Sequence, residues 1–294
     1  MLQLRMAVYW GCVIPNVEYA YEMSVREVLP RLGVELVDLE NVSCCGLPLT
    51  SVNAYAFLYL SARNLALAEK TGLNNLLVMC NGCHLTLSEA MHFLDHDEKL
   101  REKINSLLRD EGLEYTGSIR IWHLIDLLHD MIKEEIIQKS VKKRLEGLKL
   151  ASHYGCHTIR PSRPGRIDDP ENPRKMDDLI RLLGATSVDY PEKLDCCGAL
   201  LLWSHPDAAL TFAGLKLMAV QEHGFDGLVV SCPACHLMFD ARQRAAGATV
   251  GSKLNLPVLY YSQLLGTAMG IEEEKLGLHL NRRPVDKLLE KCLT

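Results

Sequence analysis

Ten cysteines of this chain fall into two sets of five with the same layout. Each set has a lone cysteine, then an adjacent pair, then a C-x-x-C motif, and 34 residues separate the pair from the motif in both sets. The first set is Cys12, Cys44, Cys45, Cys80 and Cys83, and the second is Cys156, Cys196, Cys197, Cys232 and Cys235. This repetition indicates a tandem duplication in which each half builds one thiolate-rich site. We expect the remaining cysteine, Cys292, to be a free thiol without function.

Five thiolates in each half favour an iron–sulfur cluster over the other chemistries that cysteine supports. A structural zinc takes four ligands in a tetrahedron, and adjacent cysteines are poorly placed to bind one tetrahedral ion. Iron–sulfur clusters normally use four cysteines, so a fifth suggests bridging ligation. One zinc shared by the two C-x-x-C motifs would leave six cysteines without a role. A redox-active C-x-x-C pair with a lowered thiol pKa would leave the adjacent pairs idle. Both alternatives stay open.

Three histidines lie next to the cysteine motifs. His84 and His236 directly follow the two C-x-x-C motifs, and His153 precedes Gly155 and Cys156. Imidazole titrates near neutral pH, so each is a candidate proton donor or a hydrogen-bond partner of sulfur. The alternative is that His84 and His236 cap or pack within the first turn of a helix. The tryptophans Trp10, Trp122 and Trp203 are expected in the core or in a cavity wall.

A short apolar strand is predicted immediately before the lone cysteine and before the C-x-x-C motif of each half. These strands cover 6–10, 76–79, 148–154 and 228–230, and further strands at 34–39 and 186–190 lead to the adjacent pairs. Helices are predicted between them at 17–32, 54–70, 175–183 and 207–223, several of them ending at a glycine. Alternating strands and helices indicate an α/β fold with parallel sheets, in which ligands gather at the carboxyl ends of the strands.

We therefore predict two similar tandem repeats, each a small, mostly parallel sheet flanked by helices, with the cysteine motifs at the carboxyl ends of strands. The first repeat covers 1–147 and the second 148–294. The segments 119–128 and 256–265 align as the tails of the repeats. An extra helical stretch is predicted at 98–110 in the first half, and a charged, solvated helix at 133–147 joins the halves.

Composition excludes several broad classes of protein. Hydrophobic residues make up 48% and charged residues 23% of 294 residues, which is typical of a globular chain. A formal charge of −5 gives no basic surface for nucleic acid. The N-terminal residues lack the pattern of a secretory signal, and no apolar run approaches the roughly 18 residues of a membrane span. We expect a cytoplasmic protein, in which clustered cysteines bind metal more often than they form disulfides.

The duplicated motif resembles that of the cysteine-rich CCG domain family, and in particular the B subunit of heterodisulfide reductases. The resemblance covers nearly the whole chain. It includes GCVIPN at 11–16, SARNLALAE at 61–69, HYGCH at 153–157, CPACHLMFD at 232–240 and SQLLGTAMG at 262–270. Two loops depart from the family pattern: the first pair is followed by GLPLTSVN, and the second by GALLLWSHPD, which is more apolar than expected. These departures concern the particular substrate more than the clusters.

This resemblance implies two noncubane [4Fe-4S] clusters, one on each set of five cysteines, facing each other across a substrate cavity. It implies an oxidoreductase that reduces a disulfide, such as the coenzyme M–coenzyme B heterodisulfide of methanogenesis, to two thiols. The implied partners are a ferredoxin-type protein like the C subunit of those reductases, a flavoprotein like their A subunit and, further out, a hydrogenase or formate dehydrogenase. A small-molecule disulfide or thiol is the implied substrate.

Three other functions remain open. Similar CCG domains serve as iron–sulfur electron-transfer subunits of quinone-linked dehydrogenases, in which the redox chemistry takes place on another chain. A thiol-oxidising homologue in sulfur metabolism would run the reaction in reverse. A zinc-stabilised assembly module would have no catalytic activity.

Overall fold

The computed structural model describes residues 4–160 and 165–291. Cys292 lies outside these residues, and the prediction made for it therefore stays untested.

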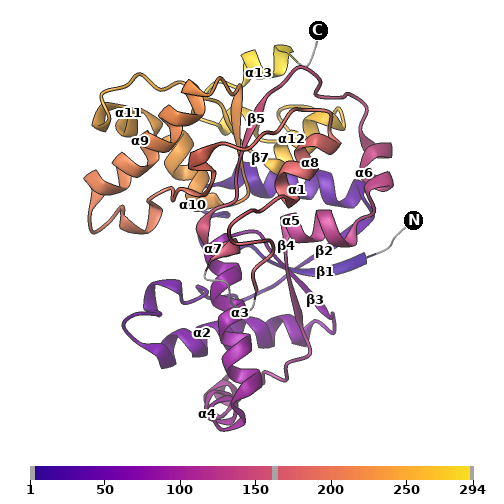
Figure 1. Cartoon of the computed structure of the whole chain (residues 1–294). Coiled ribbons are helices and arrows are strands. Elements are labelled where there is room, and N and C mark those ends of the chain that lie inside the picture. Colours follow the sequence, from indigo (N-terminus) through magenta and orange to yellow (C-terminus); the bar gives the residue numbers. More distant parts are fainter. Residues whose placement is uncertain (1–3, 161–164, 292–294) are drawn as a thin grey trace.

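Two parallel sheets form the framework of the chain (Figure 1). The first has four strands in the order β2-β1-β3-β4, and the second has three in the order β5-β6-β7. Every named pair of neighbours is parallel. The strands are β1 (Leu4–Tyr9), β2 (Val34–Asp38), β3 (Asn75–Val78), β4 (Arg120–His123), β5 (Leu150–His153), β6 (Gly227–Val230) and β7 (Val258–Tyr260). The predicted α/β fold with two parallel sheets is confirmed.

Helices connect and cover the strands. They are α1 (Tyr19–Arg31), α2 (Ala54–Lys70), α3 (Asn81–His96), α4 (Glu98–Leu108), α5 (Leu124–Asp126), α6 (Glu134–Ser140), α7 (Cys156–Ile159), α8 (Lys175–Leu182), α9 (Pro206–Glu222), α10 (Pro233–His236), α11 (Gln243–Thr249), α12 (Tyr261–Ala268) and α13 (Asp286–Lys291). Two π-helical turns, Leu127–Met131 and Leu237–Ala241, extend α5 and α10. The Asn53 side chain caps α2 by accepting a hydrogen bond from the Ala56 amide at 3.0 Å, and Pro206 opens α9.

One predicted strand is wrong. The segment 186–190 does not form a strand, and only Thr186 makes an isolated bridge, to Lys149. The following side chains are engaged in polar contacts instead, since Ser187 donates to Asp177 at 2.6 Å and Asp189 pairs with Lys193 at 2.7 Å. These contacts divert the chain away from the sheet, which is why the second sheet has one strand fewer than the first. The predicted linker helix at 133–147 is also shorter, being helical only in α6.

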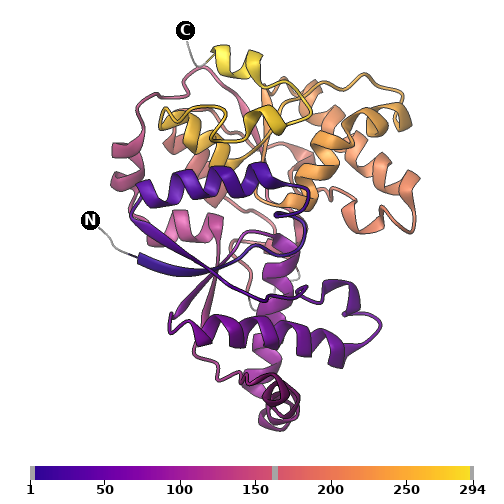
Figure 2. The same cartoon turned by 180° about the vertical axis from the view of Figure 1, so that it is seen from behind.

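The hydrophobic core crosses from one half of the chain to the other. Helix α1 belongs to the first half but packs against α12 of the second, beside the second sheet (Figure 2). Tyr21 stacks on Tyr260 with ring centroids 4.0 Å apart, and the hydroxyls of Ser24 and Ser262 lie 2.7 Å apart. A second core fills the other face of the first sheet, beneath α2, α3 and α4. The division of the chain at residue 147 therefore stays a prediction.

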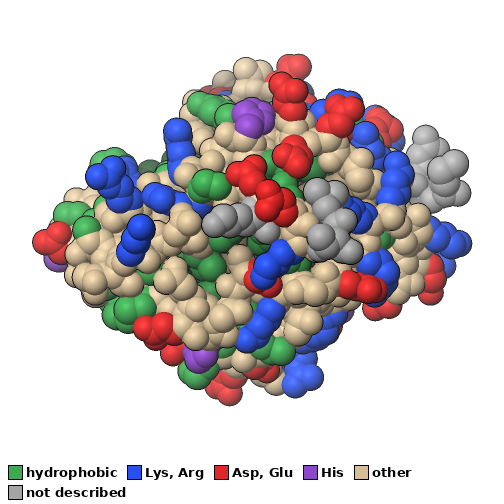
Figure 3. Space-filling model, turned by 90° about the horizontal axis from the view of Figure 1, so that it is seen from above, with side chains coloured by type: hydrophobic (Ala, Val, Ile, Leu, Met, Phe, Trp, Pro, Cys, Tyr) green, Lys and Arg blue, Asp and Glu red, His purple; other side chains and the backbone are tan. Residues whose placement is uncertain are grey.

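The surface shows no large field of one charge. On the face in Figure 3, basic and acidic side chains are interspersed, in keeping with the small net charge of the chain. Among the helices of the described residues, none has the length and apolarity needed to cross a bilayer.

Candidate metal centre

Each lone cysteine and each C-x-x-C motif begins within three residues of the end of a strand. Cys12 follows β1 and Cys80 follows β3, while Cys156 follows β5 and Cys232 follows β6. Strands β1 and β3 are parallel neighbours, and so are β5 and β6. The carboxyl ends of neighbouring parallel strands lie at the same edge of a sheet, so the motifs of each half converge there.

The five thiols of each half form a continuous row in which each thiol affects the pKa of the next. In the first half the order along the row is Cys12, Cys44, Cys45, Cys83 and Cys80. In the second half the order is Cys156, Cys196, Cys197, Cys235 and Cys232. The order is the same at matching positions, so the two halves build the same arrangement. We call these rows the first and the second quintet.

The two quintets meet at their C-x-x-C motifs. The thiols of Cys80 and Cys232 act on each other's pKa, so the two rows adjoin at these residues. Cys232 is buried, whereas Cys12 and Cys196 are exposed. The row is therefore more enclosed where the halves meet, and each quintet also reaches solvent.

Hydrogen bonding between neighbours favours thiolates at defined places in the rows. A hydrogen bond from Cys12 lowers the pKa of Cys44 to about 2, and one from Cys156 lowers the pKa of Cys196 to about 2. The same contacts raise the pKa of Cys12 and of Cys156. Thiols that share protons in this way form a donor set that metal ions can deprotonate.

Two glycines leave room for the sulfurs. Gly11 has φ +72°, and a Cβ at this position would lie 3.1 Å from the sulfur of Cys83. Gly155 has φ +73°, and its Cβ would lie 3.4 Å from the sulfur of Cys235 and only 2.4 Å from Nδ2 of Asn81. Both positions combine a backbone conformation that disfavours other residues with close contact to a candidate ligand. The glycine before each lone cysteine thus forms part of the cradle.

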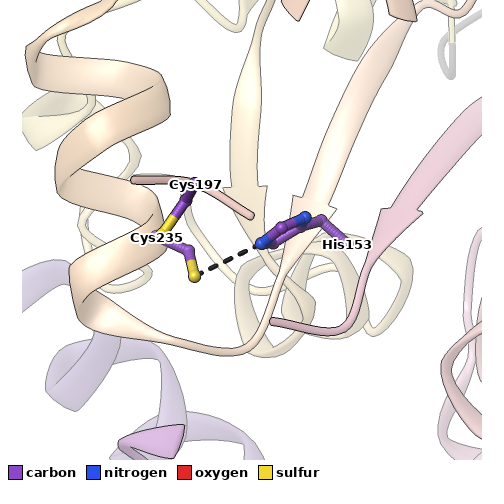
Figure 4. A group of neighbouring side chains, drawn as sticks. All are labelled: His153, Cys197 and Cys235. Atoms are coloured by element: carbon purple, nitrogen blue, oxygen red, sulfur yellow. Dashed lines mark hydrogen bonds between the residues drawn. The ribbon is translucent and has the colours of Figure 1, made fainter. Parts of the chain in front are cut away.

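The donor set fits a multi-iron cluster better than one tetrahedral ion. Among the described residues, one group brings three ligand atoms within 4.8 Å of one another, namely His153, Cys197 and Cys235 (Figure 4). The described residues contain no corresponding group of four cysteine sulfurs, although four would have to crowd together around a single zinc. Ten thiols spread along the edges of two sheets suit clusters whose ligands bind different irons.

The three candidate histidines are all buried. In Figure 4 the ring of His153, at the end of β5, points at Cys235, and its Nε2 lies 3.3 Å from that sulfur. His84 packs edge-on against His123, and Nδ1 of His236 lies 2.7 Å from Oε2 of the buried Glu18. Burial lowers the pKa of His84 and of His153 to about 3, so both imidazoles are neutral near pH 7. For His153 this state favours the role of hydrogen-bond partner over that of proton donor.

Two tryptophans lie where the sequence placed them and one does not. Trp122 is buried in β4 and Trp10 is half-buried, but Trp203 is 91% exposed. Trp203 lies in the apolar loop after the second pair, where Leu200 is also exposed. A side chain so open to solvent belongs neither to the core nor to a closed cavity wall.

Sequence reasoning missed two polar residues at the site, Asn81 and Lys216. Asn81 lies inside the first C-x-x-C motif and contacts the second half through its side chain, which donates to the Tyr154 carbonyl at 2.6 Å. Lys216, in α9, is 1% exposed and interacts electrostatically with Cys235. An alignment of the two halves at their cysteines would have identified both residues as differences between the halves. Pro233 stands where the first half has Asn81, and Asn64 stands where the second half has Lys216.

Comparison with known proteins places this geometry among cysteine-rich redox subunits. Residues 6–88 and 150–240 both match the CCG family, described as a cysteine-rich domain. The chain is 36% identical over 281 residues to the B subunit of the ferredoxin/F(420)H(2)-dependent CoB-CoM heterodisulfide reductase of Methanosarcina acetivorans, covering 94% of this chain and 93% of that protein. It is also 33% identical to the 8-methylmenaquinol:fumarate reductase membrane anchor subunit of Wolinella succinogenes, covering 98% and 100%.

A solved structure shares the fold. A hypothetical protein from Helicobacter pylori superposes with a TM-score of 0.76 at 19% identity, over 96% of this chain. This chain spans 52% of the length of that protein. At this identity the likeness shows the fold alone.

Proposed function

The chain belongs to the CCG cysteine-rich domain family, and from this premise we propose that it is the disulfide-reducing subunit of a heterodisulfide reductase-type complex. The relatives are subunits of multisubunit reductases, which supports an iron–sulfur redox subunit that works with partner subunits. The finer proposal is two noncubane [4Fe-4S] clusters, one held by each quintet. When bound, such clusters supply one-electron transfer at the point where the quintets meet.

The observation that carries this proposal is that the C-x-x-C motif of the first half lies against the second site. Asn81 of that motif donates to the Tyr154 carbonyl at 2.6 Å, and a Cβ on Gly155 would lie 2.4 Å from Nδ2 of Asn81 and 3.4 Å from the sulfur of Cys235. Cleavage of a disulfide adds two electrons and two protons and gives two thiols. A cluster on each quintet would supply one electron at a time, so two adjacent sites match the demand of a two-electron bond cleavage. Separate sites at opposite ends of the molecule would relay electrons but could not act together on one S–S bond.

The residues of the chain contribute placement and environment. The ten cysteines hold the clusters, and Gly11 and Gly155 leave the space next to Cys83 and Cys235. In this proposal no cysteine attacks the substrate, which distinguishes the reaction from thiol–disulfide exchange through a mixed disulfide. The substrate is a small-molecule disulfide, such as the heterodisulfide of coenzyme M and coenzyme B.

The proposed partners follow from the heterodisulfide reductase relatives. A ferredoxin-type protein, like the C subunit of those reductases, supplies electrons. A flavoprotein, like their A subunit, stands behind it, with a hydrogenase or formate dehydrogenase further along. The complex would work in the cytoplasm, where thiol products stay reduced.

One comparison favours a second candidate function. The relative from Wolinella succinogenes is named for menaquinol and fumarate chemistry, not for a disulfide. A chain with the same two quintets could therefore pass electrons from a quinol to another subunit. A thiol that perturbs the clusters supports the reductase, whereas a quinol that reduces them without any effect of thiols supports this alternative.

The proposal is tested on the complex purified without oxygen, by counting iron, sulfide and zinc and recording EPR spectra with and without candidate thiols. Two clusters require about eight irons per chain, and a thiol substrate should change the paramagnetic signal. Cys44→Ala and Cys196→Ala should each remove about half of the iron if each quintet holds one cluster. One zinc and negligible iron, in a preparation shown to have lost no cluster, would overturn the proposal.

A further inference from the structure

The two quintets match in geometry but not in their polar surroundings. From the adjacent pair to the C-x-x-C motif, matching positions are 152 residues apart, as in Cys44 and Cys196. The structure shows the same correspondence. A Cβ on Gly46 would contact Phe57, and a Cβ on the matching Gly198 would contact Ala209, the residue that matches Phe57. Differences at matched positions therefore show where the two sites are built differently.

The first difference is a buried amine, which contributes positive charge in its protonated form. Lys216 is 1% exposed, donates to the carbonyl of Glu192, and interacts electrostatically with Cys235 and His153. The matching residue is Asn64, a neutral amide that is fully buried. Asn64 donates to the carbonyls of Cys44 and Leu60 at 3.2 and 2.9 Å. The second quintet thus has a buried amine on the helix that packs against it, where the first has a neutral group.

Carboxylates near Lys216 do not cancel this difference. Glu192 and Asp195 both act on Lys216, and Ser43 occupies the position that matches Asp195. Asp195 is exposed, so water screens its charge, whereas Lys216 is enclosed and is screened much less. Glu192 matches Glu40, so a carboxylate is present at that position in both halves.

The second difference is in hydrogen bonds to sulfur. Nε2 of His153 lies 3.3 Å from the sulfur of Cys235, and against a thiolate, which can only accept, that nitrogen must donate. By counting back from the lone cysteine, the matching residue is Tyr9, whose hydroxyl donates to the Ser43 carbonyl at 2.7 Å. The second quintet therefore has an imidazole that donates a hydrogen bond to sulfur. The matching phenol in the first half donates to a backbone carbonyl instead.

The third difference is at the junction of the quintets. The backbone N–H of Asn81 donates to the sulfur of Cys232. The matching residue is Pro233, which has no N–H and so cannot return the bond to Cys80. The amides of Gly46 and Gly198 reach Cys44 and Cys196 respectively, and the amide of Cys45 is a further donor to Cys44.

All three differences act in the same direction on the electrons. Reduction adds negative charge to an iron–sulfur cluster, and both positive charge and hydrogen bonds to its sulfurs stabilise the reduced form and raise the potential. Solvent exposure also stabilises the reduced form, and it acts partly in the opposite direction. Cys12 and Cys80 are more exposed than Cys156 and Cys232, whereas Cys196 is more exposed than Cys44. The second quintet has the greater number of donors and the buried lysine.

We propose that the two quintets are redox-inequivalent, that the second holds its cluster at the higher reduction potential, and that Lys216 is a main determinant of the difference. This inference rests on the proposed function, because it requires a cluster on each quintet. An electron supplied to the pair then rests on the second quintet, and the first passes electrons toward it. The two halves therefore have different tasks despite their common layout.

The test is an EPR-monitored redox titration of the anaerobic complex, after its iron has been counted. The wild type should show two separate reduction steps, and the step that remains in Cys44→Ala should be the one at higher potential. Lys216→Asn installs the residue of the first half and should lower this step relative to the other by at least about tenfold in the equilibrium constant, or 59 mV for a one-electron couple. His153→Tyr, also a first-half residue, should shift the same step in the same direction.

Lys253→Asn is the matched control, because it removes an exposed lysine of the second half. This variant should leave both steps in place, and the iron content should stay equal in all lysine variants. The inference would be overturned if the two reduction steps of the wild type coincide. It would also be overturned if neither Lys216→Asn nor His153→Tyr shifts the step at higher potential. Both outcomes would leave the proposed function intact. A wild-type complex without iron would instead overturn the proposed function.

Discussion

Replacing Gly155 by alanine tests the description of the contact between the two halves. Gly155 has φ 73° and ψ 141°, a combination that is close to glycine-only. An added Cβ would lie 2.4 Å from Nδ2 of Asn81, which donates to the Tyr154 carbonyl at 2.6 Å and to Thr158 at 3.3 Å. The methyl group and the amide cannot both keep their places, so these buried hydrogen bonds must break.

The cost has two parts. Backbone strain contributes about 1–3 kcal/mol, and a buried donor left without its partner contributes about another 1–3 kcal/mol. Gly224→Ala is the matched control, because Gly224 has φ +70° but nothing within 4 Å of an added Cβ. This control should cost only the strain of a left-handed residue, about 1–2 kcal/mol.

The measurement is equilibrium urea unfolding of the full chain, together with iron per chain in the complex. Gly155→Ala should be less stable than Gly224→Ala and should hold less iron, because displacement of Asn81 disturbs the junction at Cys232. In the background of Asn81→Ala the obstacle is gone, and Gly155→Ala should then cost only its backbone strain, about 1–3 kcal/mol. Fully additive costs in this double mutant, or equal losses in the two glycine variants, would refute the reasoning.

Three further predictions follow from buried polar groups. Tyr260→Phe removes a 2.6 Å hydrogen bond to the buried Glu18 carboxylate and should cost about 1.5–3 kcal/mol in urea unfolding; a neutral result would mean that the carboxylate finds another donor. Asp177→Ala should lower the unfolding free energy by about 3–5 kcal/mol, because Asp177 is 1% exposed and pairs with a lysine. Glu35→Ala, which breaks an exposed ion pair, should lower it by less than about 1 kcal/mol. Similar losses of stability in the two variants would contradict this reasoning. Burial lowers the pKa of Lys216 to about 7, so the cluster-free chain should gain stability as the pH rises from about 7 toward 10.5, by at most about 5 kcal/mol. Stability rises with pH because the unfolded chain binds one more proton than the folded chain in this range. Lys216→Met should flatten the rise of the unfolding free energy with pH. An unchanged slope in this variant would show that other groups cause it.

The features that the sequence could predict are local ones. A strand that runs into Gly-Cys or Cys-x-x-Cys places its cysteine at the edge of a parallel sheet, and this holds for Cys12, Cys80, Cys156 and Cys232. The failure at 186–190 has a local cause, because polar partners nearby in the sequence, Asp177 for Ser187 and Lys193 for Asp189, outweigh the strand propensity of five residues.

Other features depend on how the halves dock and could not be predicted from periodicity. The contact between Cys80 and Cys232 exists only because two separate sheets bring their edges together. Lys216 lies in a helix in which a lysine would ordinarily face water, and lysine is almost never fully buried without a partner. Trp203 shows the opposite case, since a large apolar side chain in the loop of the second pair remains exposed.

The packing of α1 against α12 also constrains how the chain can be made. The Ser24–Ser262 pair spans 238 residues of sequence. At about 5–20 residues per second, roughly 12 to 50 s of translation separate the two helices. Throughout this interval α1 is outside the ribosome without the surface that buries Tyr21, and a binding protein or transient non-native contacts must cover it. The core that joins the two halves is therefore completed only after α12 has been synthesised.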